Sequence, residues 1–192
     1  GFFDVVAYEG DGQAGHTVSH NLGVAPEMIW VKSRSNGLNW QVYHSGLDAT
    51  APEDYRLMLN TSNARLAHNE SWNQPQPGSD VFTLGSQGDV NFNTYTYVAY
   101  LFASVPGISK VGSYTGTGAD QEIDCGFTTG ARFVLIKRTD ATGDWLVQDS
   151  LRGLTGSINH ALALNKTDAQ ISGEYARTYP AGFIAMNNKA SD

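Results

Sequence analysis

Several features that mark other protein classes are scarce or missing in this sequence of 192 residues. It has one cysteine, Cys125, which excludes an internal disulfide and a zinc site built from several cysteines. No apolar run approaches the ~20 residues that a membrane-spanning helix needs. Positive charge is also scarce, because 12 Lys and Arg stand against 19 Asp and Glu, giving a formal net charge of −7. Without a basic stripe, nucleic acid is not an expected partner.

Catalytic signatures are missing as well. No G-x-S-x-G nucleophile elbow occurs, and the five histidines are scattered. The run Gly10-Asp11-Gly12-Gln13-Ala14-Gly15 fits G-x-G-x-x-G, but a dinucleotide site needs a helix next, and residues 16–20 are β-like. We therefore interpret this run as a hairpin loop and Cys125 as a small buried filler. We predict a protein that is not an enzyme and has no cofactor.

The chain matches itself. Residues 1–12 align with 107–118, and after one residue is lost in a loop, residues 28–32 align with 133–137. Further matches follow in the same order: Trp40 with Trp145, Ser45 with Ser150, residues 57–60 with 162–165, and Phe82 with Phe183. Matching apolar blocks in one order indicate duplication of a unit of about 105 residues.

The second copy is incomplete. The first copy ends in its strongest strand pattern, residues 93–103, and the counterpart would begin where the sequence stops, at Asp192. We therefore predict a first repeat over 1–104 and a truncated second repeat over 105–192, packed either as two units or as one. A lost terminal strand leaves an open sheet edge. Because Gly1 aligns with the interior Gly107, we expect the natural polypeptide to extend beyond both ends.

Strand patterns run through the whole chain. The apolar runs at 28–32 and 133–136 are typical of strands buried on both faces, whereas residues 40–44 alternate. Turn signals such as Asn36-Gly37 separate the strands, and only Pro52-Glu53-Asp54-Tyr55 suggests a helical turn. Short strands at regular spacing predict an all-β fold, an antiparallel β-sandwich of jelly-roll type with two tandem pseudo-repeats.

Aromatic residues give the strongest binding signal. Trp40 and Trp145 are equivalent in the two copies, so we interpret both as core residues. Trp72 has no counterpart and lies in a polar segment, where an indole among amides is a common way to hold a sugar ring. The alternative is that Trp72 folds back onto the sandwich. The candidate ligand-binding residues are Trp72, Asn69, Asn73 and Tyr55.

Carboxylates offer a second candidate site. Asp140 and Asp144 flank a Gly turn, and Asp120, Glu122 and Asp124 alternate along one predicted strand. Either group supplies the oxygen ligands that Ca²⁺ prefers, although the EF-hand spacing is absent and a solvated surface is the alternative. We keep Asp140 and Asp144 as candidate calcium ligands and predict no other metal.

Several runs carry a family resemblance. They are YEGDG at 8–12, HNLGVAPEMIWVK at 20–32, NWQVYH at 39–44, VFTLG at 81–85, YVAYLFA at 97–103 and GISKVGSYTG at 107–116. Together they resemble a repeated β domain of tailed-phage virion proteins of the tail-fibre or structural type. The resemblance covers nearly the whole chain. Its glycines and aromatics look structural, so it implies no catalytic residue.

The resemblance implies a virion structural module, located in the extracellular phage particle. The leading hypothesis is a tail-fibre or appendage protein that contacts a host surface glycan. The alternative is a capsid decoration, cement or head-fibre protein with a purely structural role. A polysaccharide depolymerase is disfavoured because the short period of a β-helix is absent. The implied partners are other virion proteins and further copies of the chain in a homo-oligomer, without nucleic acid or membrane insertion.

Overall fold

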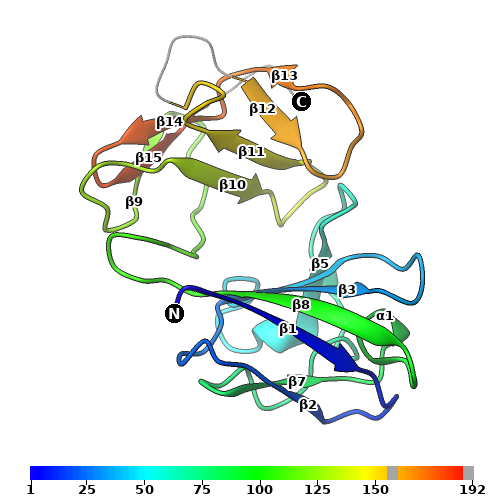
Figure 1. Cartoon of the computed structure of the whole chain (residues 1–192). Coiled ribbons are helices and arrows are strands. Elements are labelled where there is room, and N and C mark those ends of the chain that lie inside the picture. Colours follow the sequence, from blue (N-terminus) through cyan, green and yellow to red (C-terminus); the bar gives the residue numbers. More distant parts are fainter. Residues whose placement is uncertain (155–159, 188–192) are drawn as a thin grey trace.

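The computed structural model describes residues 1–154 and 160–187 and consists almost entirely of antiparallel strands (Figure 1). The first half contains β1 (Phe3–Glu9), β2 (His16–Ser19), β3 (Met28–Ser33), β4 (Gln41–His44), β5 (Tyr55–Met58), β6 (Leu66–Ala67), β7 (Val81–Leu84) and β8 (Thr96–Phe102). A 3-10 turn, η1 (Pro52–Asp54), and a short helix, α1 (Gly88–Asn91), lie between them. The predicted all-β antiparallel class is confirmed, and η1 begins at the proline where the sequence suggests a helical turn.

Two sheets enclose the core of the first half. The larger has the order β1-β8-β3-β4-β5-β6, and the smaller pairs β2 with β7. Ile29, Tyr97 and Leu101 reach the core from the larger sheet, and Phe82 and Leu84 reach it from the smaller one. Strands from the two ends of the unit pair with each other as in a jelly roll, since β8 lies between β1 and β3, and β7 lies beside β2. The strands β3-β4-β5-β6 form a meander.

The second half repeats part of this strand order. Its strands are β9 (Gln121–Asp124), β10 (Phe133–Lys137), β11 (Trp145–Asp149), β12 (His160–Ala163), β13 (Ile171–Ser172), β14 (Ala176–Tyr179) and β15 (Gly182–Ala185). The sheet β10-β11-β12-β13 corresponds to β3-β4-β5-β6, and the pairing of β15 with β9 corresponds to that of β7 with β2. β14 extends the smaller sheet on the other side of β15.

Equivalent hydrogen bonds recur in the two halves. Trp40 N donates to Asn60 Oδ1 at 3.0 Å, and Trp145 N donates to Asn165 Oδ1 at 2.8 Å. Each bond ties the start of one strand to the turn that follows the next strand. The matched sequence blocks therefore build matched local structure.

Two strands of the first half have no counterpart in the described part of the second. Residues 110–118 align with part of β1 and the loop after it but form no strand, and β10 is the edge of its sheet. In the first half, β8 separates β1 from β3 and pairs with both. An extended segment needs such a neighbour to use its backbone hydrogen-bonding groups.

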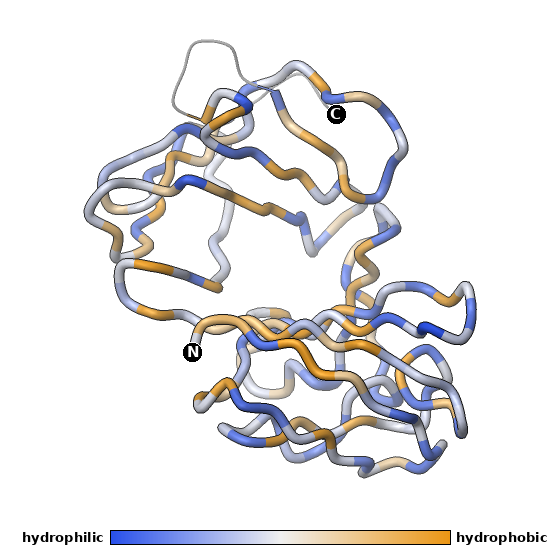
Figure 2. Tube along the Cα trace, in the orientation of Figure 1, coloured by the Kyte–Doolittle hydropathy of each residue, from blue (hydrophilic) through white to orange (hydrophobic). Residues whose placement is uncertain are grey.

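The two halves contact each other through a small apolar cluster. Trp145 is 2% exposed and packs in this cluster with Val42 and Leu57, and its Nε1 donates to Met58 O at 3.0 Å. Two backbone bonds add to the contact, from Arg65 N to Thr139 O (2.9 Å) and from Gly143 N to Ser62 O (2.8 Å). Apolar stretches of β1, β8 and β10 lie on the two sides of the boundary between the halves (Figure 2).

One expectation about the strands is wrong. The apolar runs at 28–32 and 133–136 are not buried on both faces. In β3, Ile29 and Val31 are fully buried, but Trp30 on the other face is only half-buried. In β10, Phe133 is 60% exposed. The second face is apolar because it looks toward the other half of the molecule.

Candidate functional site

One face of the larger sheet carries a row of aromatic side chains. Successive residues of a strand point to opposite faces, so those that do not enter the core gather on the other side. They are Phe3 of β1, Tyr100 and Phe102 of β8 and Trp30 of β3, joined by Trp40 just before β4. Ring centroids are 4.8 Å apart for Trp30 and Phe102, 5.2 Å for Phe3 and Phe102, and 6.0 Å for Trp40 and Tyr100. The rings form one continuous surface.

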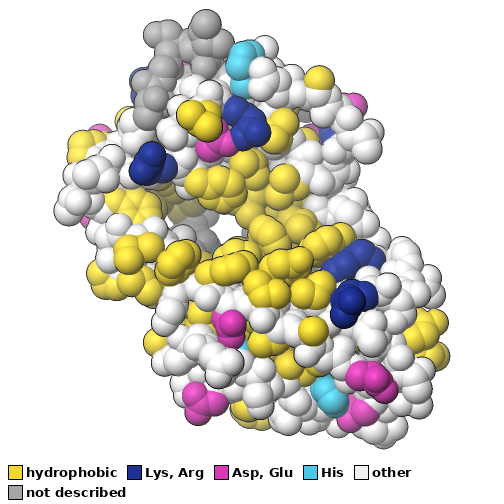
Figure 3. Space-filling model, viewed as in Figure 1, with side chains coloured by type: hydrophobic (Ala, Val, Ile, Leu, Met, Phe, Trp, Pro, Cys, Tyr) yellow, Lys and Arg dark blue, Asp and Glu magenta, His cyan; other side chains and the backbone are white. Residues whose placement is uncertain are grey.

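Much of this aromatic row is left uncovered by protein. Phe3 and the neighbouring Val5 are each 45% exposed, and Trp30, Trp40 and Tyr100 are half-buried. Apolar side chains gather along the boundary between the halves, on both sides of a hollow (Figure 3). A contiguous exposed apolar surface is typical of a binding site.

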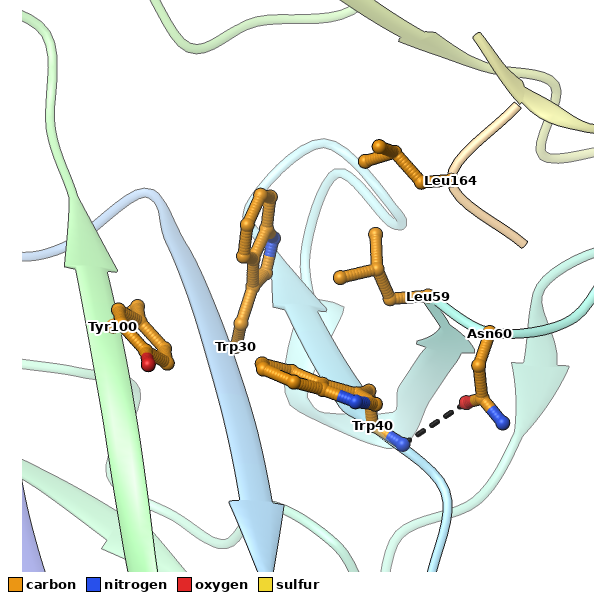
Figure 4. A pocket seen from close by; sticks show the side chains of 6 residues that line it. All are labelled: Trp30, Trp40, Leu59, Asn60, Tyr100 and Leu164. Atoms are coloured by element: carbon orange, nitrogen blue, oxygen red, sulfur yellow. Dashed lines mark hydrogen bonds between the residues drawn. The ribbon is translucent and has the colours of Figure 1, made fainter. Parts of the chain in front are cut away.

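Part of this surface closes into a pocket of about 340 Å³, which we call the aromatic cleft. Trp30 stands between Tyr100 and Leu59, Trp40 lies across the floor, and Leu164 approaches from the second half (Figure 4). The lining residues are Trp30, Trp40, Leu59, Asn60, Tyr100 and Leu164. Both halves therefore contribute to the cleft.

Hydrogen bonds fix the polar rim of the aromatic cleft. Asn60 Oδ1 accepts the Trp40 backbone N–H, and Asn60 Nδ2 donates to Asn39 Oδ1 at 2.8 Å (Figure 4 shows the first bond). The Asn60 carboxamide and the Trp40 backbone are thus positioned before any ligand binds. In the wall, Trp30 Nε1 is buried and has no acceptor among the described residues, which leaves an unsatisfied donor.

The aromatic cleft is electrically neutral. Its described lining holds two indoles, a phenol, two leucines and one carboxamide, without Asp, Glu, Lys, Arg or His. A charged ligand would lose hydration there without gaining a counter-charge. The chemistry suits a neutral ligand with a flat apolar face and hydrogen-bonding groups at its edge.

Trp72 does not form the exposed platform that the sequence suggests. It is 2% exposed, pairs with Leu84 through an isolated β-bridge, and packs edge-on against Tyr43 with ring centroids 5.8 Å apart. The alternative stated for it, a residue folded back onto the sandwich, is what the structure shows. Its polar neighbours in sequence conceal this burial.

The other candidate ligand-binding residues lie outside the lining of the aromatic cleft. Asn69 is exposed, and Asn73 is half-buried beside the core tryptophan. Tyr55 packs in the cluster between the halves, with the Arg65 guanidinium 4.5 Å from its ring centroid. One sequence signal could have predicted the aromatic cleft. In residues 28–31 and 97–102 the side chains on both faces of the strand are apolar, so those outside the core need a second partner.

The two candidate calcium ligands are each engaged by separate groups. Asp140 Oδ1 accepts a hydrogen bond from Arg138 Nε at 2.8 Å, which lowers the pKa of that carboxyl. Asp144 accepts a hydrogen bond from Asn165 and pairs with Lys166 at 2.7 Å, and these contacts also lower its pKa. Within residues 1–154 and 160–187, no group of three or more His, Cys, Asp and Glu could hold a metal ion.

No described helix has the length and apolar character to span a membrane.

A buried polar network lies beneath the larger sheet. Gln41 Nε2 donates to Asp89 at 2.7 Å, and Arg56 donates to both Gln41 and Ser71 at 3.4 Å. Ser71 Oγ lies 3.1 Å from His68 Nδ1, whereas the serine of a catalytic triad bonds to Nε2 of its histidine. Ser71 is also fully buried, out of reach of a substrate. We interpret the network as structural, because it links β4 and β5 to α1.

Comparison with known families places almost the whole chain in one group. The family described as "Domain of unknown function (DUF7483)" matches residues 1–190. The chain belongs to this family. No curated protein and no solved structure shows a significant match. Because the DUF7483 match spans both halves, the family unit includes the aromatic cleft between them. The resemblance to phage virion proteins stays a prediction.

Proposed function

We propose that this DUF7483 chain is a non-catalytic binding module whose aromatic cleft holds a neutral carbohydrate. The observation that carries the proposal is the meeting of Trp30, Trp40 and Tyr100 with the fixed amide of Asn60 in a cleft without charge. Aromatic faces pack on the C–H faces of sugar rings, and carboxamides bind their hydroxyls. A volume of about 340 Å³ is near the lower end for small-molecule sites, which suits one or two sugar rings.

The proposal places this carbohydrate site on a tailed-phage appendage that contacts a host surface glycan. The resemblance of the repeated motifs supports that setting. In that setting, copies of a weak site along one appendage would raise avidity by ~10²–10⁴ without new contacts. Presentation of several sites would compensate for a small pocket.

A capsid decoration or cement role is the second candidate. It is favoured by β1, which is the outermost strand of its sheet and carries Phe3 and Val5, each 45% exposed. An unpaired strand edge with apolar side chains is suited to a protein lattice. In that case the ligand is a particle surface and not a glycan.

The test compares Trp40→Ala with Phe92→Ala in binding to a panel of purified bacterial surface polysaccharides. Phe92 is 52% exposed and lies outside the aromatic cleft, so it controls for loss of a surface aromatic. We expect saturable binding by the wild type and by Phe92→Ala, and roughly tenfold weaker binding by Trp40→Ala, a loss of about 1.4 kcal/mol. Circular dichroism checks that both variants keep their β structure.

Two results would contradict the carbohydrate proposal. Equal binding by all three proteins would place the ligand outside the aromatic cleft. Binding to phage particles without binding to any polysaccharide would favour the decoration role instead.

A further inference from the structure

β10 carries backbone hydrogen-bonding groups that no described strand uses. Ser150 N donates to Arg132 O at 2.9 Å, so Arg132 and every second residue after it turn toward β11. These directions alternate along an antiparallel strand. The N–H and C=O groups of Phe133, Leu135 and Lys137 therefore turn to the opposite edge, where β10 is the outermost strand of its sheet.

The first half shows what covers the same edge. β3 is the counterpart of β10, and β8 pairs along its corresponding side, with Val31 opposite Ala99. Val31, Ala99 and Leu101 are all fully buried there. Ile136, the counterpart of Val31, is only partly buried. Ile136 therefore lacks the cover that a strand like β8 gives to Val31 in the first half.

Tyr114 points to the same neighbour. Its counterpart Tyr8 packs edge-on against Phe82 at 6.3 Å and stacks on Tyr97 of β8 at 5.1 Å. Tyr114 repeats the first contact, with Phe183 at 6.2 Å, but is 39% exposed. No described ring stands where Tyr97 stands in the first half.

A pocket of about 180 Å³ lies beside Tyr114 and extends to Met186. Gln121 lines it, and its Oε1 is buried without a hydrogen-bond partner in the described part of the chain. In the first half, the segment leading into β8 covers the equivalent tyrosine, because Val90 O accepts the Tyr8 hydroxyl at 2.7 Å. The pocket, the exposed ring and the free edge all lie where the first half places residues 88–102.

We propose that these features form an acceptor groove for an extended strand of a partner polypeptide with the pattern of β8. The acceptor groove consists of the free edge of β10 with Ile136, Tyr114 and Gln121. Strand addition of this kind takes its affinity from main-chain hydrogen bonds and its specificity from alternate side chains.

The partner strand has a defined chemistry. Ile136, Tyr114 and Gln121 are uncharged, so the inserted residues are uncharged, with apolar side chains at alternate positions and a small one in the middle. β8 shows this order in Tyr97, Ala99 and Leu101. The acceptor groove is also continuous with the interface between the halves, since Leu135 of β10 packs against that cluster. An added strand therefore extends an interface that already exists.

The experiment titrates the whole chain with a fluorescent synthetic peptide of residues 88–103 and follows anisotropy. We compare Leu135→Pro with Leu135→Ala. Both variants lose the same side chain, but only proline removes an N–H from the free edge, and it leaves the bonds to β11 intact. We expect saturable binding to the wild type, binding to Leu135→Ala, and at least tenfold weaker binding to Leu135→Pro. A peptide carrying Leu101→Asp should not bind.

A second measurement is independent of these variants. In the wild type, hydrogen exchange of the Phe133, Leu135 and Lys137 amides should slow when the peptide binds. Because Phe133 is 60% exposed, Phe133→Pro with Phe133→Ala is a substitute pair if either Leu135 variant fails to fold. Equal affinity of the proline and alanine variants, equal binding of the Leu101→Asp peptide, or no saturable binding of a monomeric peptide would overturn the proposal.

Discussion

At the scale of single residues, equivalent positions in the two halves carry out different tasks. The backbones of Trp40 and Trp145 make the same hydrogen bond to an asparagine. The indole of Trp145 is buried in the contact between the halves, whereas that of Trp40 is half-buried and lines the aromatic cleft. The repeat therefore predicted the backbone environment of both residues. Its prediction of a core side chain holds fully for Trp145 and in part for Trp40, which is half-buried at the margin of the same apolar cluster.

The two asparagines that accept these hydrogen bonds, Asn60 and Asn165, give a matched test of the aromatic cleft. Asn60→Ala removes the acceptor for the Trp40 N–H, and we expect the free energy of unfolding to fall by about 1 kcal/mol. Carbohydrate binding should weaken as well, because Trp40 loses its anchor. Asn165→Ala removes the same bond in the second half and should cost similar stability without weakening binding. Urea denaturation and a polysaccharide titration measure the two effects, and equal loss of binding in both variants would contradict the role of Asn60.

At the scale of elements, β8 is the strand on which the first half depends. It pairs with β1 on one side and β3 on the other. Its buried residues Tyr97, Ala99 and Leu101 build the core, while Tyr100 and Phe102 build the aromatic row on the opposite face. One strand therefore joins the stability of the fold to the shape of the candidate site.

Tyr97 also fastens α1 to β8. Its hydroxyl donates to Gly88 O at 2.6 Å and accepts the Phe92 N–H at 2.8 Å. We expect Tyr97→Phe to lower the free energy of unfolding by about 1–3 kcal/mol, because two backbone groups lose their partner. Tyr95→Phe is the control, since within the described residues its hydroxyl makes one hydrogen bond, an exposed one from Asn36 Nδ2 at 3.4 Å. Urea denaturation compares the two, and a change of similar size in both would show that the α1 attachment does not matter.

The strands were largely visible in the sequence, but the candidate site was not. Apolar blocks recur in order because each strand needs a face for the core, and this pattern predicted β3, β8 and β10. The environment of Trp72 depends on its place opposite Leu84 of a distant strand, which its polar neighbours do not reveal. The aromatic cleft needs Leu164 of the second half beside Trp30 and Trp40 of the first. No pattern within a single repeat specifies how two repeats pack.

At the scale of the whole molecule, two half-buried histidines, His44 and His68, make stability depend on pH. Burial lowers the pKa of His44 below its ordinary value of 6.5, and its Nδ1 accepts the Gly46 N–H at 2.9 Å, which requires an unprotonated nitrogen. Partial burial also lowers the pKa of His68, with a contribution from Arg56. Between the folded and unfolded pKa values, the unfolded chain binds more protons, so stability falls as the pH falls.

Acidic groups add a second loss at lower pH. The Gln13 N–H and the His16 side chain lower the pKa of Asp11 from 3.8 to about 2. A carboxyl with a lowered pKa stabilises the folded state above its unfolded value of 3.8, and this contribution disappears as the pH falls toward 2. Asp48, Asp140 and Asp144 act in the same direction because their pKa values are also lowered.

We therefore expect the free energy of unfolding to fall in two steps on acidification. The first begins below the ordinary histidine pKa of 6.5, and the second lies between 3.8 and about 2. His44→Gln should reduce the slope of the first step while leaving the second unchanged, because it removes one proton-binding group from the unfolded chain. Urea denaturation at a series of pH values measures both steps. An unchanged slope between about pH 7 and 5 in this variant would mean that His44 is protonated as readily in the folded chain as in the unfolded one.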